Sequence, residues 1–327
     1  MPVGSGTTSH QYDTGRMAFP SPASRPTSGQ QFVVGHGHQR VVVTEVGATL
    51  RSYTIDDRHV VDGFEDTELC PSGRGQVLAP WPNRLGDGRY QFGGRAGRAP
   101  LDEPERGNAI HGLVRWLAWQ PRWQAQNVLG LGCVLEPQPG YPWRLSLEVE
   151  YRLGRGGLVV TTAATNLDDA PAPFGIGFHP YLSVGTSTVD AARLSLPASH
   201  ALVTDERGLP VGERHVGGTE LDFRVARPIG PTRLDTAFFG LARDGRGVAR
   251  VELEHPDEEH GVALWVDGAF AYLMAYTGDT VGDLERRRRS IALEPMTCPP
   301  DALRSGTAVI TLAPGASWQG SWGLEPW

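Results

Sequence analysis

The chain has 327 residues, of which 39% are hydrophobic and 20% are charged, and its formal net charge is −7. This composition is typical of a globular protein with a large hydrophobic core. The mild acidity, and the lack of a basic stripe with interleaved aromatic residues, argue against a nucleic-acid partner. No apolar run reaches the roughly 20 residues of a membrane helix, and none near the N-terminus resembles a signal peptide. We expect a cytoplasmic protein, a monomer or homodimer, with no membrane partner.

The three cysteines, Cys70, Cys133 and Cys298, are an odd number at wide spacings. This pattern predicts neither a disulfide framework nor a metal-binding knuckle, and it fits a reducing compartment. A nucleophilic role for Cys298 stays open as an alternative to a structural one.

Residues 1–30 are rich in Gly, Ser, Thr and Pro and show no apolar periodicity, which predicts a disordered leader. Residues 31–327 contain no linker, no internal repeat and no low-complexity tract. We therefore expect one domain after the leader.

Short β-branched runs begin at residue 31, where residues 35–38 are expected to form a hairpin turn. His36 and His38 form a His-x-His pair in that turn, but no third metal ligand accompanies them, so we expect no metal site. Residues 145–153 alternate strictly between apolar and polar, as a half-buried strand does. Further strand-like runs follow at residues 158–162, 248–254, 262–266, 270–277, 290–293 and 307–312. Short strands separated by Gly-rich and Pro-rich turns predict an all-β sandwich or barrel.

Residues 174–182, with the sequence FGIGFHPYL, place one histidine in a stiff apolar frame. Gly175 and Gly177 allow the backbone to approach a neighbour closely, and Pro180 biases His179 towards an extended conformation. Histidine suits proton transfer because its ordinary pKa lies near neutral pH. The alternative is a buried histidine that bonds a backbone carbonyl.

Four other stretches carry polar residues at expected strand ends or in Gly/Pro loops. Asn83 and Arg84 form a hydrogen-bonding pair suited to a hydroxyl-rich ligand, and His111 precedes a glycine. Asp235 is an acid within an apolar setting, and Glu294 is expected to end a strand that Pro295 then stops. A β scaffold can bring such positions together in one site.

In this order, the Asn-Arg, His-Gly, His-Pro-Tyr, Leu-Asp and Leu-Glu-Pro motifs resemble those of the aldose 1-epimerase (galactose mutarotase-like) family, from about residue 32 to the C-terminus. The resemblance implies a large antiparallel β-sandwich, the galactose mutarotase-like supersandwich, with a sugar as substrate. It implies that Glu294 is the general base and His179 the general acid. It also implies that Arg84 and His111 bind and polarise the sugar and that Asp235 holds its hydroxyls.

The implied reaction interconverts the α and β anomers of a free hexose by opening its ring, which needs two proton transfers and no cofactor. Two departures from the family pattern weaken a preference for galactose. His111-Gly112 is followed by Leu-Val-Arg-Trp instead of a Gly-rich stretch, and Glu294 is followed by Pro-Met instead of Thr-Gln.

Three alternative functions stay open. Arg115 could meet a phosphate, which would make the protein a hexose-6-phosphate 1-epimerase. The same scaffold could bind a sugar without catalysis, and Asp235 with Glu294 could form the carboxyl pair of a glycoside hydrolase. The basic run at residues 286–289 fits either a solvated loop or a phosphate site.

Overall fold

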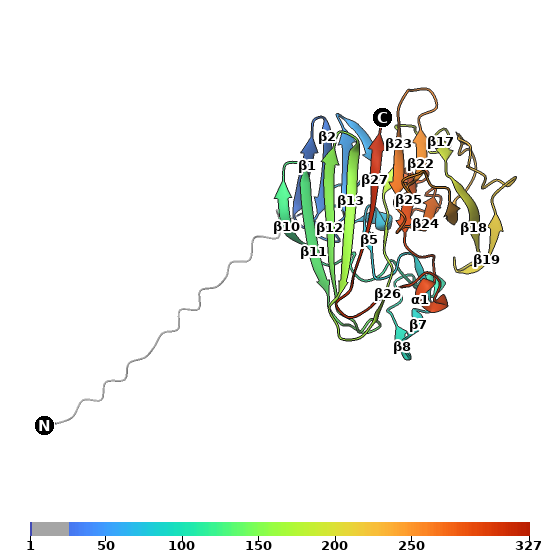
Figure 1. Cartoon of the computed structure of the whole chain (residues 1–327). Helices are drawn as coiled ribbons and strands as arrows, with labels where there is room; N and C mark the ends of the chain where they lie inside the picture. Colours follow the sequence, from blue (N-terminus) through green and yellow to red (C-terminus); the bar gives the residue numbers. More distant parts are fainter. Residues whose placement is uncertain (2–25) are drawn as a thin grey trace.

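The computed structural model describes residues 1 and 26–327, and strands dominate this part of the chain (Figure 1). Its strands form two large antiparallel sheets, one of twelve strands and one of nine. The one α-helix in the described residues, α1 (Ala302–Ser305), is a single turn. Three further turns are of the 3-10 type, at Pro71–Gly73, Pro104–Arg106 and Leu284–Arg286. The predicted all-β antiparallel sandwich is confirmed.

The twelve-stranded sheet has a continuous path of ten strands, β1-β2-β3-β4-β16-β25-β24-β21-β18-β19, to which β15 and β5 are added beside β25. The bounds of its strands are β1 (Gln31–His36), β2 (Gln39–Thr44), β3 (Leu50–Ile55), β4 (Arg58–Val61), β5 (Val77–Leu78), β15 (Gly177–Phe178), β16 (Tyr181–Leu182), β18 (Ala198–Thr204), β19 (Pro210–His215), β21 (Asp235–Leu241), β24 (Tyr272–Tyr276) and β25 (Ile291–Met296).

The nine-stranded sheet has the order β10-β11-β12-β13-β27-β23-β22-β17-β20. Its strands are β10 (Gln120–Ala125), β11 (Val128–Leu135), β12 (Leu145–Gly154), β13 (Gly157–Asn166), β17 (Arg193–Ser195), β20 (Arg227–Pro228), β22 (Ala249–Glu254), β23 (Gly261–Val266) and β27 (Ser317–Pro326). Three two-stranded pairs complete the described part: β6 (Arg84–Gly86) with β9 (Asn108–Ile110), β7 (Arg89–Phe92) with β8 (Arg95–Arg98), and β14 (Ala172–Phe174) with β26 (Ile310–Leu312).

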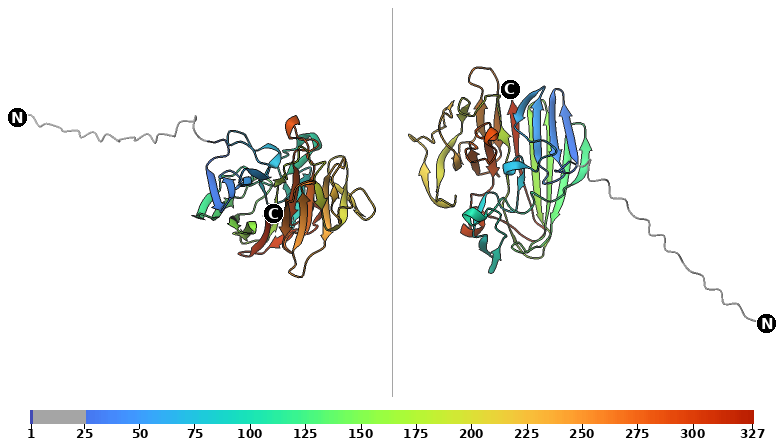
Figure 2. Two further views of the ribbon diagram at one scale, coloured as in Figure 1. Left: turned by 90° about the horizontal axis from the view of Figure 1, so that it is seen from above. Right: turned by 180° about the vertical axis from the view of Figure 1, so that it is seen from behind.

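The two large sheets pack face to face around one hydrophobic core, and the view from behind in Figure 2 places β1–β4 in front of the strands of the other sheet. Alternating side chains explain this packing. In β12, Leu145, Leu147, Val149, Tyr151 and Leu153 are all buried, and the residues between them are at least partly exposed. A strand with this period of two buries one face against a partner sheet and exposes the other to water.

One strand of the twelve-stranded sheet, β25, departs from the prediction. Glu294 was expected to end the strand before Pro295, yet both residues lie inside β25, opposite Met274 and Leu273 of β24. The amide groups of Leu293 and Thr297 bond Pro180 and Ile176, on the side of β25 away from β24. Pro295 lies between Leu293 and Thr297 and faces the same side, at the gap between β15 and β16. Because no strand is paired there, the N–H that proline lacks would have had no ladder partner.

Ordered structure begins earlier than the expected end of the leader. Thr27 donates its amide proton to Asp66, and Ser28 and Gln30 accept from Val46 and Glu45. Residues 26–30 therefore pack onto the sandwich, which differs from the expectation that disorder reaches residue 30. The rest of the expected leader, residues 2–25, lies outside the described residues.

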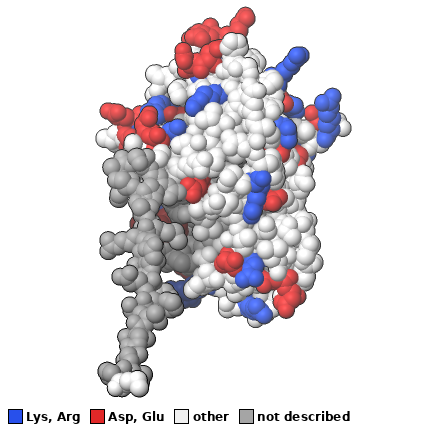
Figure 3. Space-filling view, turned by 90° about the vertical axis from the view of Figure 1, so that its left-hand side faces the viewer, with Lys and Arg blue, Asp and Glu red and all other residues white. Residues whose placement is uncertain are grey.

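Charged side chains lie interspersed on the face drawn in Figure 3, where acidic and basic groups surround a broad uncharged area. In the described part of the chain, no helix has the length and hydropathy of a membrane span.

Tyr151 ties the two sheets together, because its hydroxyl in β12 donates a hydrogen bond of 2.6 Å to the carbonyl of Ala48, just before β3. Both groups are buried, so Tyr151→Phe should lower the free energy of unfolding by about 1–3 kcal/mol through the unsatisfied carbonyl. Val159→Ala, on the outer face of β13, should change it by about 0.5 kcal/mol. Urea denaturation of both variants tests this, and equal effects would contradict a tie between the sheets at Tyr151.

Candidate active site

One pocket of about 360 Å³ brings together all six residues that the sequence predicts for the site. These residues are Asn83, Arg84, His111, His179, Asp235 and Glu294. The pocket lies on the twelve-stranded sheet, since Glu294 belongs to β25, Asp235 begins β21, and His179 connects β15 to β16. Arg84 begins β6 and lies opposite Ile110 of β9, and Asn83 and His111 lie directly before β6 and directly after β9. Residues more than 200 positions apart in the chain thus line one polar cavity.

His179 and Glu294 are in direct contact at the bottom of this pocket. Nε2 of His179 lies 3.3 Å from Oε1 of Glu294, and both side chains are almost fully buried. Nδ1 of His179 and Oε2 of Glu294 are also buried and have no hydrogen-bond partner among the described residues. Buried polar atoms without a partner are costly and rare. The pair is therefore built to receive polar groups of a ligand.

Burial governs the protonation of this pair. It lowers the pKa of His179 to about 3. Burial, with the nearby charge of Asp235, raises the pKa of Glu294 well above its ordinary range, against the opposing effect of Arg84. Both shifts favour the neutral forms, because a charged group loses its hydration in the interior. In the unliganded pocket, burial therefore disfavours both the imidazolium of His179 and the carboxylate of Glu294.

His111 is held in one tautomer. The backbone amide of Asn83 donates to Nδ1 of His111 at 3.3 Å, so the proton of the neutral ring lies on Nε2. Burial, followed by the charges of His179, Arg115 and Arg84, lowers the pKa of His111 well below its ordinary value. The ring packs edge-on against His179 with centroids 5.3 Å apart. His111 thus offers a neutral N–H donor beside the pair.

Arg84 is fixed by carboxylates on two sides. Its guanidinium group bonds both oxygens of Glu103 at 3.0–3.2 Å, and Nη1 lies 3.9 Å from Asp235. Hydrogen bonds to a carboxylate hold a guanidinium in a defined plane. The sequence predicts an apolar setting for Asp235, and this prediction is wrong, because its side chain is 45% exposed at the mouth of the pocket. Asp235 can therefore reach a ligand from the solvent side.

An unpredicted stack supports His179 from behind. The ring of Tyr181 stacks on the imidazole with centroids 5.1 Å apart and an interplanar angle of 15°. The guanidinium carbon of Arg74 lies 3.9 Å from the centroid of the same tyrosine ring. Arg74 is 1% exposed, and its Nη1 bonds Oδ2 of Asp62 at 2.9 Å. The stack fixes the plane of His179 and places a buried cation two layers behind it.

Sequence reasoning missed Glu103 and Arg74 because nothing local distinguishes them from solvated residues of Gly/Pro-rich loops. Their partners, Arg84 and Tyr181, lie 19 and 107 positions away in the chain. In the described residues there is no group of three or more His, Cys, Asp or Glu that could hold a metal. Cys298 is buried and its pKa is raised to about 12 by burial, which does not suit a nucleophile.

A buried imidazole–carboxyl pair, flanked by a fixed arginine and a neutral N–H donor, is an arrangement with the groups that general acid–base chemistry uses. Residues 30–325 match the family model for aldose 1-epimerase, and the chain belongs to that family.

The relatives include proteins with and without a known activity. The uncharacterized protein YihR of Escherichia coli K12 is 32% identical over 289 residues, which cover 88% of this chain and 90% of YihR. Human galactose mutarotase is 26% identical over 206 residues, 58% of this chain and 59% of the mutarotase.

Solved structures show the same fold. The GalM/aldose epimerase homologue of Caenorhabditis elegans has a TM-score of 0.81 at 16% identity, over 91% of this chain and 98% of that one. The galactose 1-epimerase of Lactobacillus acidophilus has a TM-score of 0.75 at 21% identity, over 91% and 94% of the two chains.

Gly112, the residue that follows His111, is expected to tolerate no side chain. This glycine has a φ of +69°, and a Cβ there would lie 2.1 Å from the carbonyl oxygen of Ala79. Gly218 has a φ of +74° but nothing within 4 Å, which makes it a matched control. Gly218→Ala should cost about 1–2 kcal/mol of stability, and Gly112→Ala about 1–3 kcal/mol more. Chemical denaturation measures both, and equal costs would show that the contact with Ala79 is not tight.

The raised pKa of Glu294 predicts a pH-dependent effect on stability. A carboxyl whose pKa is raised on folding stabilises the protein below its ordinary pKa, and this contribution is lost as the pH rises through the folded-state value. Glu294→Gln removes the titrating group. Its unfolding free energy relative to the wild type should therefore increase as the pH rises above the ordinary pKa of a glutamate, by about 1.4 kcal/mol for each pH unit in which only the folded carboxyl stays protonated. The exposed control Glu259→Gln should show no such trend, and a flat difference for Glu294→Gln would contradict the buried-carboxyl assignment.

Proposed function

We propose that the protein is an aldose 1-epimerase that interconverts the α and β anomers of a free hexose by acid–base ring opening. The observation that carries this proposal is the contact between His179 and Glu294, each with one buried polar atom unpartnered among the described residues. The anomeric oxygen and the ring oxygen of a hexose are bonded to the same carbon. The acid and the base must therefore lie close together, as these two side chains do.

The reaction begins when Glu294, as a carboxylate, takes the proton of the anomeric hydroxyl while the imidazolium of His179 gives its proton to the ring oxygen. The bond between C1 and the ring oxygen breaks, and C1 becomes an aldehyde. After rotation about the C1–C2 bond, the hydroxyl attacks the other face of the aldehyde and returns its proton to His179. Glu294 then returns its proton to the anomeric oxygen. The pair regains its starting state, so no proton, electron or cofactor is consumed.

The reacting state needs the proton on His179 and a charge on Glu294. Burial favours the neutral pair in the unliganded pocket. Hydrogen bonds from sugar hydroxyls stabilise a carboxylate, and Arg84 on the same wall lowers the pKa of Glu294. His111 donates from Nε2 and Asp235 accepts at the mouth. In this proposal these groups hold the sugar and polarise its oxygens.

The alternatives fit the geometry less well. The near partner of Glu294 is an imidazole, and Asp235 faces Arg84, which does not favour the two-carboxylate chemistry of a glycoside hydrolase. Arg115 lines the pocket, but it forms a close ion pair with Asp102. This favours a free hexose over a hexose 6-phosphate. A sugar-binding protein without catalysis would not need a buried acid–base pair. A cytoplasmic location and independence from cofactors stay predictions.

Glu294→Gln and His179→Asn should each lower kcat by about 10²–10⁴-fold, because each keeps approximate shape but removes a proton-transfer group. The two losses should not add in the double variant, since ring opening needs both groups on one substrate. NMR exchange or polarimetry on freshly dissolved α-glucose and α-galactose measures the rates, with glucose 6-phosphate as the phosphorylated alternative.

Arg84→Ala and Asp235→Ala are the matched comparison, because they remove contacts with the sugar and should raise KM more than they lower kcat. Wild-type kcat in Glu294→Gln would overturn the assignment of the base. Sugar binding without turnover of any aldose by the wild-type protein would favour a binding protein.

A further inference from the structure

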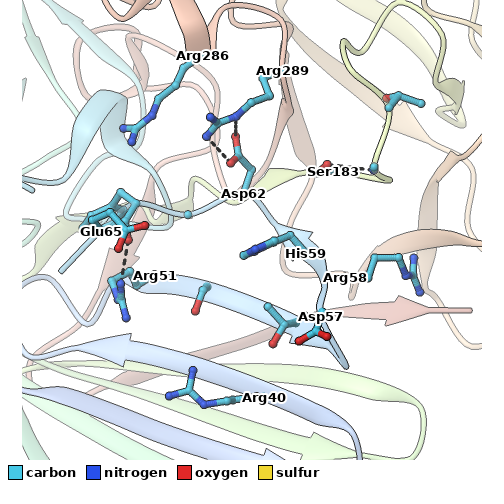
Figure 4. Close-up of a pocket in the computed structure, with 16 residues that line it drawn as sticks. Arg40, Arg51, Asp57, Arg58, His59, Asp62, Glu65, Ser183, Arg286 and Arg289 are labelled. Atoms are coloured by element: carbon cyan, nitrogen blue, oxygen red, sulfur yellow. Dashed lines mark hydrogen bonds and ion pairs between the residues drawn. The ribbon is translucent and has the colours of Figure 1, made fainter.

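A second hollow, of about 740 Å³, lies outside the candidate active site and shares none of its predicted residues (Figure 4). Strands β2, β3 and β4 line it together with loops around residues 62–65, 183–186 and 286–289. Its lining includes five arginines: Arg40, Arg51, Arg58, Arg286 and Arg289. The lining has only three acidic residues, Asp57, Asp62 and Glu65. The net charge of the whole chain, by contrast, is −7. The hollow thus concentrates positive charge in an acidic protein.

Several hydrogen-bond donors in this hollow lack partners. Nη1 of Arg51 donates to the carbonyl of Phe64 at 2.9 Å, whereas its Nε is buried and has no partner among the described residues. Within residues 26–327, the side chains of Arg40 and His59 form no hydrogen bond or ion pair, and these exposed side chains line the same hollow. A buried N–H without an acceptor is costly. The buried Nε of Arg51 therefore needs an acceptor that the described chain does not supply, and the exposed side chains of Arg40 and His59 are free to bind the same ligand.

The acidic side chains hold two of the arginines in place. Asp62 accepts from Arg289 at 2.6 Å, from Arg74 at 2.9 Å and from Ser290 at 2.6 Å. Glu68 accepts both hydrogen bonds of Nη2 of Arg286, at 2.8 and 3.0 Å. Nη1 of Arg286 and of Arg289 keeps no partner in the described chain. Asp57 and Glu65 are exposed at the rim. The carboxylates thus orient the cations without using all of their donors.

Two of the four arginines in the basic run at residues 286–289 line the hollow, and the other two point elsewhere. Arg288 bonds Asp190 and Asp279, and Arg287 bonds the carbonyl of Val281, all away from the hollow's lining. Arg286 and Arg289 line the hollow, and Figure 4 shows their guanidinium groups on the same side as Arg51 and His59. Only this half of the run contributes to the charged pocket.

We propose that this hollow, which we call the arginine pocket, binds a small phosphate-bearing molecule. A phosphate group offers several acceptor oxygens and two negative charges, and planar guanidinium groups from separate segments match it. The hydroxyls of Ser52, Thr54 and Thr186 also line the pocket and have no partner within the described residues, which suits the hydroxylated remainder of such a molecule. This inference does not depend on the activity proposed for the other pocket.

Calorimetric titration tests the proposal, with inorganic phosphate as one probe and glycerol 3-phosphate, an organic phosphate that is not an aldose, as the other. Ionic strength must be constant, because salt screens such contacts. We expect saturable binding of glycerol 3-phosphate, and tighter binding of it than of inorganic phosphate. Arg40→Glu and Arg51→Gln should each raise the Kd by about five- to tenfold, as expected for the loss of one charged contact. Arg51→Gln keeps a donor for the carbonyl of Phe64.

Arg95→Glu is the matched control for charge. Arg95 lies on β8, and its exposed side chain forms no hydrogen bond or ion pair within residues 26–327. It should leave the Kd within about twofold after correction for long-range charge. Anomer interconversion should be unchanged in Arg40→Glu, which separates a failure here from a failure of the proposed activity. The proposal is overturned if neither probe saturates, if Arg95→Glu weakens binding as much as Arg40→Glu, or if glucose competes with glycerol 3-phosphate.

Discussion

The burial of Glu294 against His179 is the constraint on which the site depends. Neither group would interact usefully in water, where each is hydrated and keeps its ordinary pKa. Removed from water, the two groups favour their neutral forms and leave one polar atom each without a partner in the described chain. Burying a carboxyl costs stability, and the large core of the sandwich offsets this cost. The site is thus a position where burial opposes the charged forms of two titratable groups.

The scaffold creates this position through an interruption in the sheet. Beside β25 the partner strand is divided into β15 and β16, and His179 lies in the break. Pro295 tolerates that break because it has no amide proton to pair there. The imidazole therefore replaces a stretch of regular ladder and faces the carboxyl of the neighbouring residue on β25. A continuous strand at this place would have satisfied the backbone but left no room for the side chain.

Asp62 connects the two pockets physically. It lines the arginine pocket and bonds Arg289 there, and it also bonds Arg74, which stacks on Tyr181 behind His179. A chain of charge-assisted and stacking contacts therefore runs from one pocket to the support of the other.

The sequence by itself predicted the all-β class, through the alternation of residues 145–153 and other short strand-like runs. Short motifs in Gly/Pro loops also singled out His179, Glu294, Arg84, Asn83 and His111, which the structure places in one pocket. The sequence misjudged Asp235, Pro295 and residues 26–30, since exposure and strand pairing depend on neighbours distant in the chain. The roles of Glu103 and Arg74, the stacking of Tyr181 on His179, and the arginine pocket were decided only by the tertiary structure. They depend on which segments the fold brings into contact, such as Arg84 with Glu103, 19 positions away, and Tyr181 with Arg74, 107 positions away, and a linear pattern carries no record of such contacts.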